Sequence, residues 1–376
     1  MIPLFRPTLT GLEPERVAAA MAAGSLSGAG AFGRRCEAWL ESATGCARAL
    51  LVPSCTHALE LSAMLLGIGP GDEVIVPSFT FSSTASAFAL HGATIVFVDV
   101  LAGTMNMDVA AAAAAITKRT RAIVPVHYAG NACDMGALIS LASAANVTIV
   151  EDAAQALGST YRERPLGSLG ALGALSFHST KNIQCGEGGA LLIGDPAMVD
   201  RAEILREKGT DRARFLRGEV DRYAWQEVGS SLLLGELPAA YLSAQLEASP
   251  EVNARRVASW EQYQAALAPL ERAGHIELPR TTPEATHNGH IFYVKTRSRA
   301  EQVALSGALK ARDIGAAFHY VPLHSAPAGV RVGRFSGDDR VTTADSARLL
   351  RLPLYDRMES ADVETVAAAI AQFYGA

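Results

Sequence analysis

Residues 73–100 read EVIVPSFTFSSTASAFALHGATIVFVDV and contain the unit from which the large sheet is built. The stretch begins with a short apolar run, Glu73–Val76, and ends with a second, Thr94–Val100. Both runs are rich in β-branched residues, which favours buried strands. The alanine-rich segment between them favours a helix. A strand, a helix and a strand in this order form a βαβ unit, in which the two strands run parallel.

The same rhythm continues along the chain. Further apolar runs lie at Arg121–Val126, Val147–Val150, Ala174–Phe177 and Ala190–Ile193. Alanine-rich helical segments such as Val109–Ile116 separate most of them, which indicates an α/β fold with a largely parallel sheet. The interval before Ala190 is shorter than the others, so the last pair is the place where the parallel order can break and the sheet become mixed.

Small or polar residues follow several of these runs, namely Pro77–Thr80, Asp99, His127–Tyr128 and Glu151–Asp152. Ligands of open α/β sheets bind outside the carboxyl ends of the strands. We therefore expect the functional site at this edge, with Asp152 and His127 near it.

The alternation of short strands and helices ends at about Glu236. A long helical segment, Leu237–Leu267, is interrupted near Ser249-Pro250, and the strand-like Ile291–Lys295 follows. Helical patterns at Arg299–Arg312 and Ser360–Phe373 complete the chain. We expect a large α/β domain over residues 1–235, including an N-terminal arm, and a smaller α+β domain over residues 236–376.

Composition excludes several classes of function. The 376 residues are 49% hydrophobic and 19% charged, with a net charge of −5, which is typical of a globular enzyme rather than of a protein that binds nucleic acid or an anionic membrane. The N-terminus lacks the pattern of a signal peptide. Five scattered cysteines form no Cys-x-x-Cys pair, so we expect neither disulfides nor a metal site, and a cytoplasmic location.

Lys181 is the first candidate catalytic residue. Only five of the 33 basic residues are lysines, and this one lies in GALSFHSTKNIQCGEGG, residues 173–189, between two apolar runs. Lysine differs from arginine because it can lose its proton and attack a carbonyl to form a Schiff base. Asp152 follows a buried strand, where a carboxylate needs a partner. A lysine and a strand-end acid together predict pyridoxal 5′-phosphate (PLP) chemistry, in which the acid keeps the pyridine nitrogen protonated.

Other residues complete a predicted cofactor site. Ser54, Cys55 and Thr56 precede a helical pattern, where they either cap the helix or hold a phosphate at its N-terminus. Ser176 is a further hydroxyl for the phosphate. Gln155, about one helical turn after Asp152, is placed to reach the ring hydroxyl, and Phe81 to stack on the ring.

One motif is misleading. Gly28, Gly30 and Gly33 fit the G-x-G-x-x-G pattern of dinucleotide-binding folds, but that pattern must follow a strand. Here the preceding segment, Glu13–Ala23, is helical. We therefore expect a glycine-rich loop, and a nicotinamide-dependent oxidoreductase is the least favoured alternative.

With these residues in place, the whole chain resembles the DegT/DnrJ/EryC1/StrS family of sugar aminotransferases. The motifs that carry the resemblance, in order, are PSCT…LE (53–60), GDEVIVPSFTFSST (71–84), PVHYAG (125–130), EDAAQ (151–155), SFHSTKN…GEGG and YVPLH (320–324). The resemblance implies a PLP-dependent transferase of fold type I, the aspartate aminotransferase-like fold. It also implies Lys181 as the Schiff-base lysine, Asp152 as the partner of the pyridine nitrogen, and Gln155, Phe81, Ser54, Cys55, Thr56 and Ser176 as further cofactor contacts.

Two positions distinguish this chain within the family. A phosphate-binding Asn that most members supply from the neighbouring subunit is replaced by Ser231, in Gly229-Ser230-Ser231. Ser231 is thus the expected contact across a homodimer with shared active sites. Lys181 stands where dehydratase relatives have a histidine, which favours transamination.

The resemblance also implies a reaction. L-Glutamate would donate its amino group to C4 of dTDP-4-oxo-6-deoxy-D-glucose, giving dTDP-4-amino-4,6-dideoxy-D-galactose and 2-oxoglutarate for surface polysaccharide synthesis. Alternatives are another nucleotide-linked keto-sugar, such as a UDP-linked or 3-oxo sugar, or a PLP-binding regulatory protein without turnover. Candidate substrate contacts are His127, Tyr128, Arg212, Arg214, Arg217, His319, Tyr320 and His324.

Overall fold

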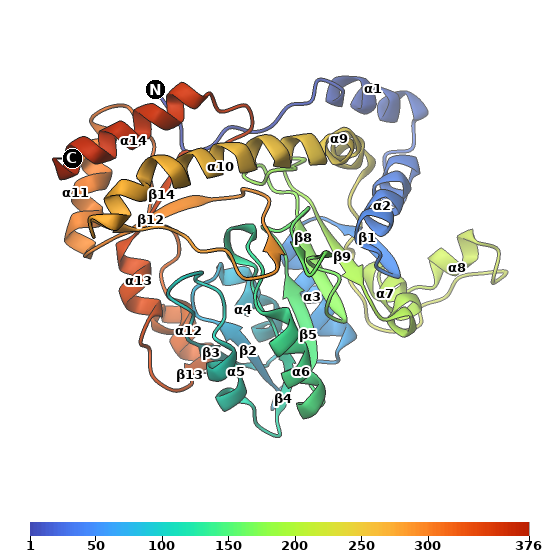
Figure 1. Ribbon diagram of the computed structural model, residues 1–376. Coiled ribbons are helices and arrows are strands. Elements are labelled where there is room, and N and C mark those ends of the chain that lie inside the picture. Colours follow the sequence, from blue (N-terminus) through green and yellow to red (C-terminus); the bar gives the residue numbers. More distant parts are fainter. Residues whose placement is uncertain (376) are drawn as a thin grey trace.

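A computed structural model describes residues 1–375, and its centre is an eight-stranded sheet (Figure 1). The strand order is β1-β9-β8-β5-β4-β2-β3-β13. Only β9 runs against the others, because it pairs antiparallel with both β1 and β8. The strands of this sheet are β1 (Arg48–Val52), β2 (Glu73–Pro77), β3 (Thr94–Val98), β4 (Thr120–Ile123), β5 (Thr148–Asp152), β8 (Leu172–Ser176), β9 (Gly189–Ile193) and β13 (Gly333–Phe335).

Helices cover both faces of this sheet because successive strand residues point to opposite sides. Val74 and Val76 pack into one buried cluster, and Ile75 between them packs into the other. One cluster takes its helical residues from α3 (Cys55–Leu65), α4 (Ser82–Ala89) and α7 (Val199–Arg206). The other takes them from α2 (Ala31–Thr44), α5 (Val109–Ala115), α6 (Met135–Ala145) and α9 (Glu236–Glu247).

The C-terminal part has its own antiparallel sheet, in the order β10-β12-β14. Its strands are β10 (Ile276–Glu277), β12 (Phe292–Thr296) and β14 (Leu349–Leu352). Helices α10 (Ser249–Arg272), α11 (Arg299–Lys310) and α14 (Ser360–Tyr374) bury a third apolar cluster with it. This unit lies above the large sheet in Figure 1. Shorter elements are α12 (Pro327–Val332), α13 (Thr342–Arg348) and the small sheet of β11 (Ala285–Thr286), β6 (Thr160–Tyr161) and β7 (Arg164–Pro165).

The predicted α/β fold with a mixed, mostly parallel sheet is confirmed, and β8 and β9 are the pair that breaks the parallel order. The division of the chain at residue 235 stays a prediction. Several C-terminal segments contact the first 235 residues: α9 packs against α1 (Glu13–Ala23) and α2, β13 pairs with β3 at the edge of the large sheet, and β11 pairs with β6.

The glycine-rich loop at residues 28–33 binds a carboxylate of the same chain. It follows α1 rather than a strand, and it leads into α2. The Glu236 carboxylate accepts hydrogen bonds from the backbone N–H groups of Phe32 (2.8 Å) and Gly33 (2.9 Å). A Cβ on Gly30 would lie 2.4 Å from the Glu236 side chain. The loop therefore joins the N-terminus of α2 to α9, which is a structural role.

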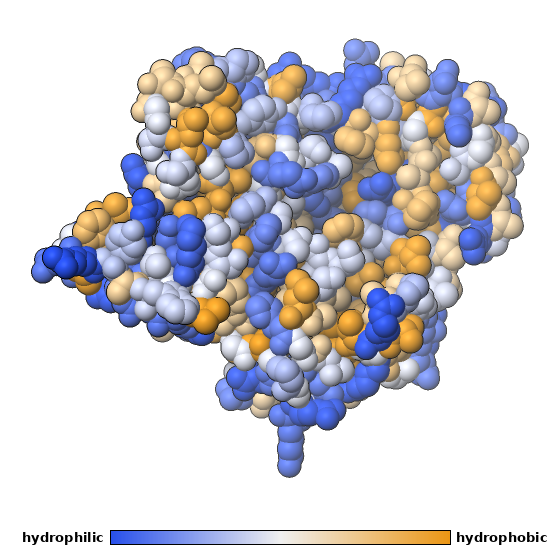
Figure 2. All heavy atoms as spheres, turned by 180° about the vertical axis from the view of Figure 1, so that it is seen from behind, coloured by the Kyte–Doolittle hydropathy of each residue, from blue (hydrophilic) through white to orange (hydrophobic). Residues whose placement is uncertain are grey.

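Residues 211–228 form a projection that contains the short helix α8 (Arg212–Leu216) and extends away from the body of the protein (Figure 1). Seen from behind, hydrophilic and hydrophobic residues lie side by side on it (Figure 2). No helix of residues 1–375 has the length and apolar character needed to cross a membrane.

Candidate active site

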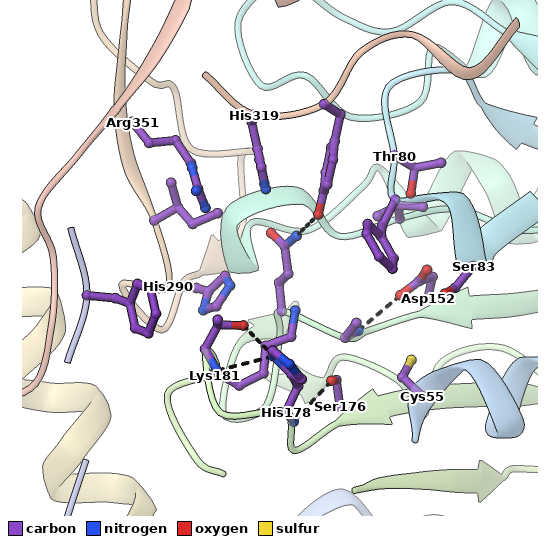
Figure 3. Close-up of a pocket in the computed structure, with 18 of the residues that line it drawn as sticks. Cys55, Thr80, Ser83, Asp152, Ser176, His178, Lys181, His290, His319 and Arg351 are labelled. Atoms are coloured by element: carbon purple, nitrogen blue, oxygen red, sulfur yellow. Dashed lines mark hydrogen bonds between the residues drawn. The ribbon is translucent and has the colours of Figure 1, made fainter. Parts of the chain in front are cut away.

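A cavity of about 740 Å³ lies between the large sheet and the C-terminal part. The carboxyl ends of β5 and β8 and the N-terminus of α3 contribute to one wall, and β14 and residues 317–320 to the other (Figure 3). The cavity brings together ten predicted site residues: Ser54, Cys55, Thr56, Phe81, Asp152, Gln155, Ser176, Lys181, His319 and Tyr320. Its position at the strand ends agrees with the general rule for α/β sheets.

Lys181 reaches the cavity from the loop between β8 and β9. The loop is closed by backbone hydrogen bonds from Ser179 N to Gly186 O and from Lys181 N to His178 O. Burial lowers the pKa of Lys181 from its ordinary value; the Asp152 charge opposes this shift and the Arg351 charge adds to it. A lowered pKa increases the fraction of neutral amine, which is the form that attacks carbonyls and accepts protons.

Asp152 is the last residue of β5 and is 5% exposed. Its Oδ2 accepts a hydrogen bond from the Thr84 hydroxyl (2.7 Å), and its Oδ1 accepts one from Ala154 N (3.2 Å). Thr84 in turn contacts the Thr80 hydroxyl at 2.7 Å. The carboxylate is therefore held at a fixed angle towards the cavity, with lone pairs left for a further donor.

The N-terminus of α3 provides a site for an anion. Ser54 caps the helix, since its side chain accepts a hydrogen bond from His57 N (3.3 Å). The Thr56 hydroxyl lies 2.7 Å from the Ser83 hydroxyl, and both face the cavity. A Cβ on Gly189 would lie 2.5 Å from Cys55 N, so only glycine lets β9 approach this turn. The predicted cap and the predicted phosphate site are thus the same atoms.

Gln155, Tyr320 and His319 form one connected group. Gln155 Oε1 accepts a hydrogen bond from Ala129 N (2.7 Å), so its Nε2 donates to the Tyr320 hydroxyl (2.9 Å). The His319 ring stacks on Tyr320 with centroids 3.6 Å apart. Burial and the charges of Arg351 and Lys181 keep the pKa of His319 well below its usual value, so this ring is neutral. Phe81 is 59% exposed, and its ring centroid lies 6.2 Å from that of Tyr320.

The structure does not bring His127 or Tyr128 into this cavity, contrary to the expectation that they contact substrate. Both are fully buried. His127 Nδ1 accepts a hydrogen bond from Cys133 N, so the proton is on Nε2, which lies 2.9 Å from Glu151. The Tyr128 hydroxyl lies 2.9 Å from His319 Nδ1. Tyr128 therefore supports His319 from behind rather than lining the cavity.

His324 and Ser231 also lie outside the cavity. The Nδ1 atom of His324 forms a hydrogen bond with the Ser78 hydroxyl (2.7 Å), and its Nε2 atom lies 3.3 Å from a carboxylate oxygen of Asp339. It therefore ties the chain after Tyr320 to the end of β2. Ser231 is exposed, and its backbone pairs with that of Glu207 as a single antiparallel β-bridge.

The three candidate arginines of the projection are each paired with a nearby carboxylate instead of facing the cavity. Arg212 lies 3.5 Å from Glu207, and Arg214 lies 3.4 Å from Glu219. Arg217 binds Glu203 and Glu219, each at 2.6 Å. Their charges are therefore already compensated by carboxylates of the same chain. None of the three lines the cavity.

Several cavity residues were not singled out from the sequence, among them Arg351, His290 and Arg256. Arg351 lies in β14, between Leu350 and Leu352, where the surrounding leucines predict only a buried strand. Arg256 donates to the backbone carbonyls of Gly289, His290 and Leu354. His290 Nδ1 is 2.9 Å from Asn182 Oδ1. Since an amide oxygen only accepts, His290 carries its proton on Nδ1 and turns an unprotonated Nε2 away from Asn182.

Comparisons with known proteins identify the family of this chain. The model of the DegT/DnrJ/EryC1/StrS aminotransferase family matches residues 7–371. The aminotransferase TlmJ from Streptoalloteichus hindustanus is 31% identical, with a TM-score of 0.91 and coverage of 100% of this chain and 99% of that one. S. venezuelae DesV, solved in complex with a ketimine intermediate, is 33% identical with a TM-score of 0.90, covering 99% and 98%. A putative sugar aminotransferase from Streptococcus pneumoniae, in its PLP form, is 27% identical with a TM-score of 0.87, covering 99% and 98%.

Proposed function

This chain belongs to the DegT/DnrJ/EryC1/StrS family of PLP-dependent sugar aminotransferases, and we propose that it transfers the amino group of L-glutamate to a nucleotide-linked 4-oxo-6-deoxy sugar. The acceptor we propose is dTDP-4-oxo-6-deoxy-D-glucose. Its product, dTDP-4-amino-4,6-dideoxy-D-galactose, would enter surface polysaccharide synthesis. The observation that carries the proposal is the meeting of Lys181, Asp152 and the N-terminus of α3 in one cavity.

The residues present fit the cofactor at both of its charged ends. The N-terminus of α3, with the hydroxyls of Thr56 and Ser83 2.7 Å apart, suits the phosphate. Ser176, at the end of β8, offers a further hydroxyl. Asp152 suits the pyridine nitrogen, because both of its oxygens are oriented by other donors. When bound, PLP supplies an aldehyde for the amine of Lys181 and an electron-withdrawing ring that makes the donor α-proton acidic.

Lys181 then has two tasks. Its amine would anchor the cofactor, and the same amine, once free, would take the proton from the donor's α-carbon and later deliver one to C4 of the sugar. Burial suits it to both tasks by lowering its pKa. A histidine in this position could not be displaced as an amine by the donor. The presence of lysine therefore supports transamination rather than dehydration.

The specific sugar rests on sequence stretches far from Lys181. SGAGAFGRRCEAWLE (27–41) and REKGTDRARFLRGEVDRYAWQEVGSS (206–231) are the ones we associate with a dTDP-linked 4-oxo sugar. A direct test incubates the purified protein with glutamate and dTDP-4-oxo-6-deoxy-D-glucose and determines the C4 configuration of the product by NMR. The galacto amine is the expected product. No amine from this sugar, with turnover of a UDP-linked or 3-oxo sugar, would contradict the assignment.

We also propose that the active protein is a homodimer. The projection at residues 211–228 exposes Phe215, Tyr223, Trp225 and Val228, which are 40–76% accessible. An apolar cluster of this kind on a charged projection is typical of a surface that contacts another subunit. Ser231 lies at the base of the projection, which is consistent with its reaching a neighbouring copy.

A further inference from the structure

Among the described residues that line the cavity, Arg351 is an arginine with no carboxylate partner. Arg351 extends from β14, and its buried Nε has no hydrogen-bond partner. None of the ion pairs formed among residues 1–375 includes it. Arg348, three residues earlier at the end of α13, binds Glu277 at 2.7 Å and Asp345 at 2.8 Å. A guanidinium in a partly buried position without an acceptor is costly, so Arg351 is placed for an anion that the chain itself does not supply.

Arg351 is not part of the phosphate site for the cofactor. Figure 3 shows its guanidinium on the side of the cavity where His319 and His290 lie, across from Cys55, Ser83 and Asp152. Arg256, the other cavity arginine, already donates to three backbone carbonyls. Arg351 is therefore the cavity arginine with donors free for a second anion.

Arg351 lines the same cavity as the reacting amine of Lys181. It contributes, after burial, to the lowered pKa of Lys181 and of His319. An amino donor carries its carboxylate on the reacting carbon itself. In a nucleotide sugar the diphosphate is attached at C1, across the ring from a reacting C4. A cation that lines the cavity of the reacting amine, away from the helix N-terminus that suits the cofactor phosphate, consequently matches the donor carboxylate better than the diphosphate.

We propose that Arg351 binds a carboxylate of the amino donor and so orients the donor's α-carbon towards Lys181. The fork of a guanidinium matches a carboxylate through two parallel hydrogen bonds. The neutral rings of His319 and His290 flank the guanidinium and leave its charge for the ligand. This inference rests on the proposed aminotransferase function, but not on the identity of the sugar.

The test separates the two half-reactions. The PLP form of the Arg351→Met variant is mixed with glutamate alone, while cofactor absorbance is recorded. The form that carries pyridoxamine 5′-phosphate (PMP), the aminated cofactor, is mixed with the keto-sugar alone and followed in the same way. We expect the apparent KM for glutamate to rise roughly 10- to 100-fold, and the sugar half-reaction to change less than about threefold. Arg351→Lys should lie between Arg351→Met and the wild type. Arg357→Met is the matched control, since that arginine is exposed and lies 3.8 Å from Asp356, and it should leave both half-reactions unchanged.

A second measurement does not depend on turnover. Glutarate has the carboxylates of the donor but no amino group, so it binds without reacting. Its dissociation constant for the PLP-bound enzyme should rise about 10-fold or more in Arg351→Met. If Arg351→Met does not fold, Arg351→Lys gives the same comparison with a smaller effect.

Unchanged glutamate kinetics together with unchanged glutarate binding would overturn the inference. A loss confined to the sugar half-reaction would also overturn it, and would assign Arg351 to the diphosphate. If the protein turned over none of the keto-sugars, the proposed function would fail while the glutamate half-reaction still reported on Arg351.

Discussion

At the scale of single residues, the side chains that act on the cofactor are distinguished by how other groups hold them. Asp152 has one oxygen fixed by Thr84 and the other by Ala154 N. The sequence indicated Asp152 because a carboxylate at the end of a buried strand needs a partner. It did not indicate Thr84, because a threonine in a small-residue helix looks like ordinary packing. The two meet only when β5 and α4 come together, 68 residues apart in sequence.

Asp152→Asn should slow the glutamate half-reaction by roughly 10²- to 10⁴-fold, because a neutral amide no longer favours a protonated pyridine nitrogen. Stopped-flow absorbance on the PLP-bound variant measures the rate. Thr84→Val, which removes the hydroxyl and keeps the shape, should give a smaller loss. A half-reaction of wild-type rate in Asp152→Asn would remove Asp152 from the proposed role.

At the scale of elements, six strands of the large sheet and the long C-terminal helices were predicted from apolar periodicity, including the break between α9 and α10 near Ser249. β1 and β13 were not counted in the predicted sheet. β13 has only three residues, Gly333–Phe335, and it pairs with β3 about 240 positions earlier. Local patterns carry no information on such distant pairing. The sequence correctly indicated that the glycine-rich loop does not have the context of a dinucleotide-binding motif. It did not indicate that Glu236 accepts hydrogen bonds from this loop, because a local motif gives no information on a distant residue.

The link between that loop and α9 predicts a loss of stability in Glu236→Ala. Removal of the carboxylate leaves the N–H groups of Phe32 and Gly33 without their acceptor at the start of α2. We expect the free energy of unfolding to fall by about 1–3 kcal/mol, measured as a shift of the urea midpoint. Glu364→Ala, on the exposed face of α14, is the matched control. Equal midpoints for the two variants would show that the contact contributes nothing.

At the scale of the whole molecule, the cavity needs both parts of the chain. Lys181 and Asp152 come from the large sheet, whereas His319, Tyr320 and Arg351 come from residues beyond 315. The sequence named the first group and two of the second. His127 and His324, which we expected to contact substrate, do not line this cavity, because a polar residue near a strand end can also face inward and bind another part of the chain. Burial of that kind depends on packing, which no local pattern encodes.

The exposed apolar side chains of the projection predict that it takes part in self-association. Trp225→Asp should shift the protein from dimer to monomer at micromolar concentration, because a charge would replace an exposed tryptophan that the proposed interface would bury. Sedimentation velocity measures the shift. Arg222→Asp, a charge change on the same projection, tests whether charge alone is responsible. A protein that remains equally dimeric in Trp225→Asp would exclude this surface.

The central claim is that Lys181 anchors the cofactor and moves the protons of transamination. It is tested most directly by following cofactor absorbance when glutamate is added to the purified wild-type protein and to Lys181→Ala. The wild type should convert to its PMP form, whereas Lys181→Ala should bind PLP without a covalent bond and convert at least about 10³-fold more slowly. Conversion of Lys181→Ala at a rate near that of the wild type would contradict the account.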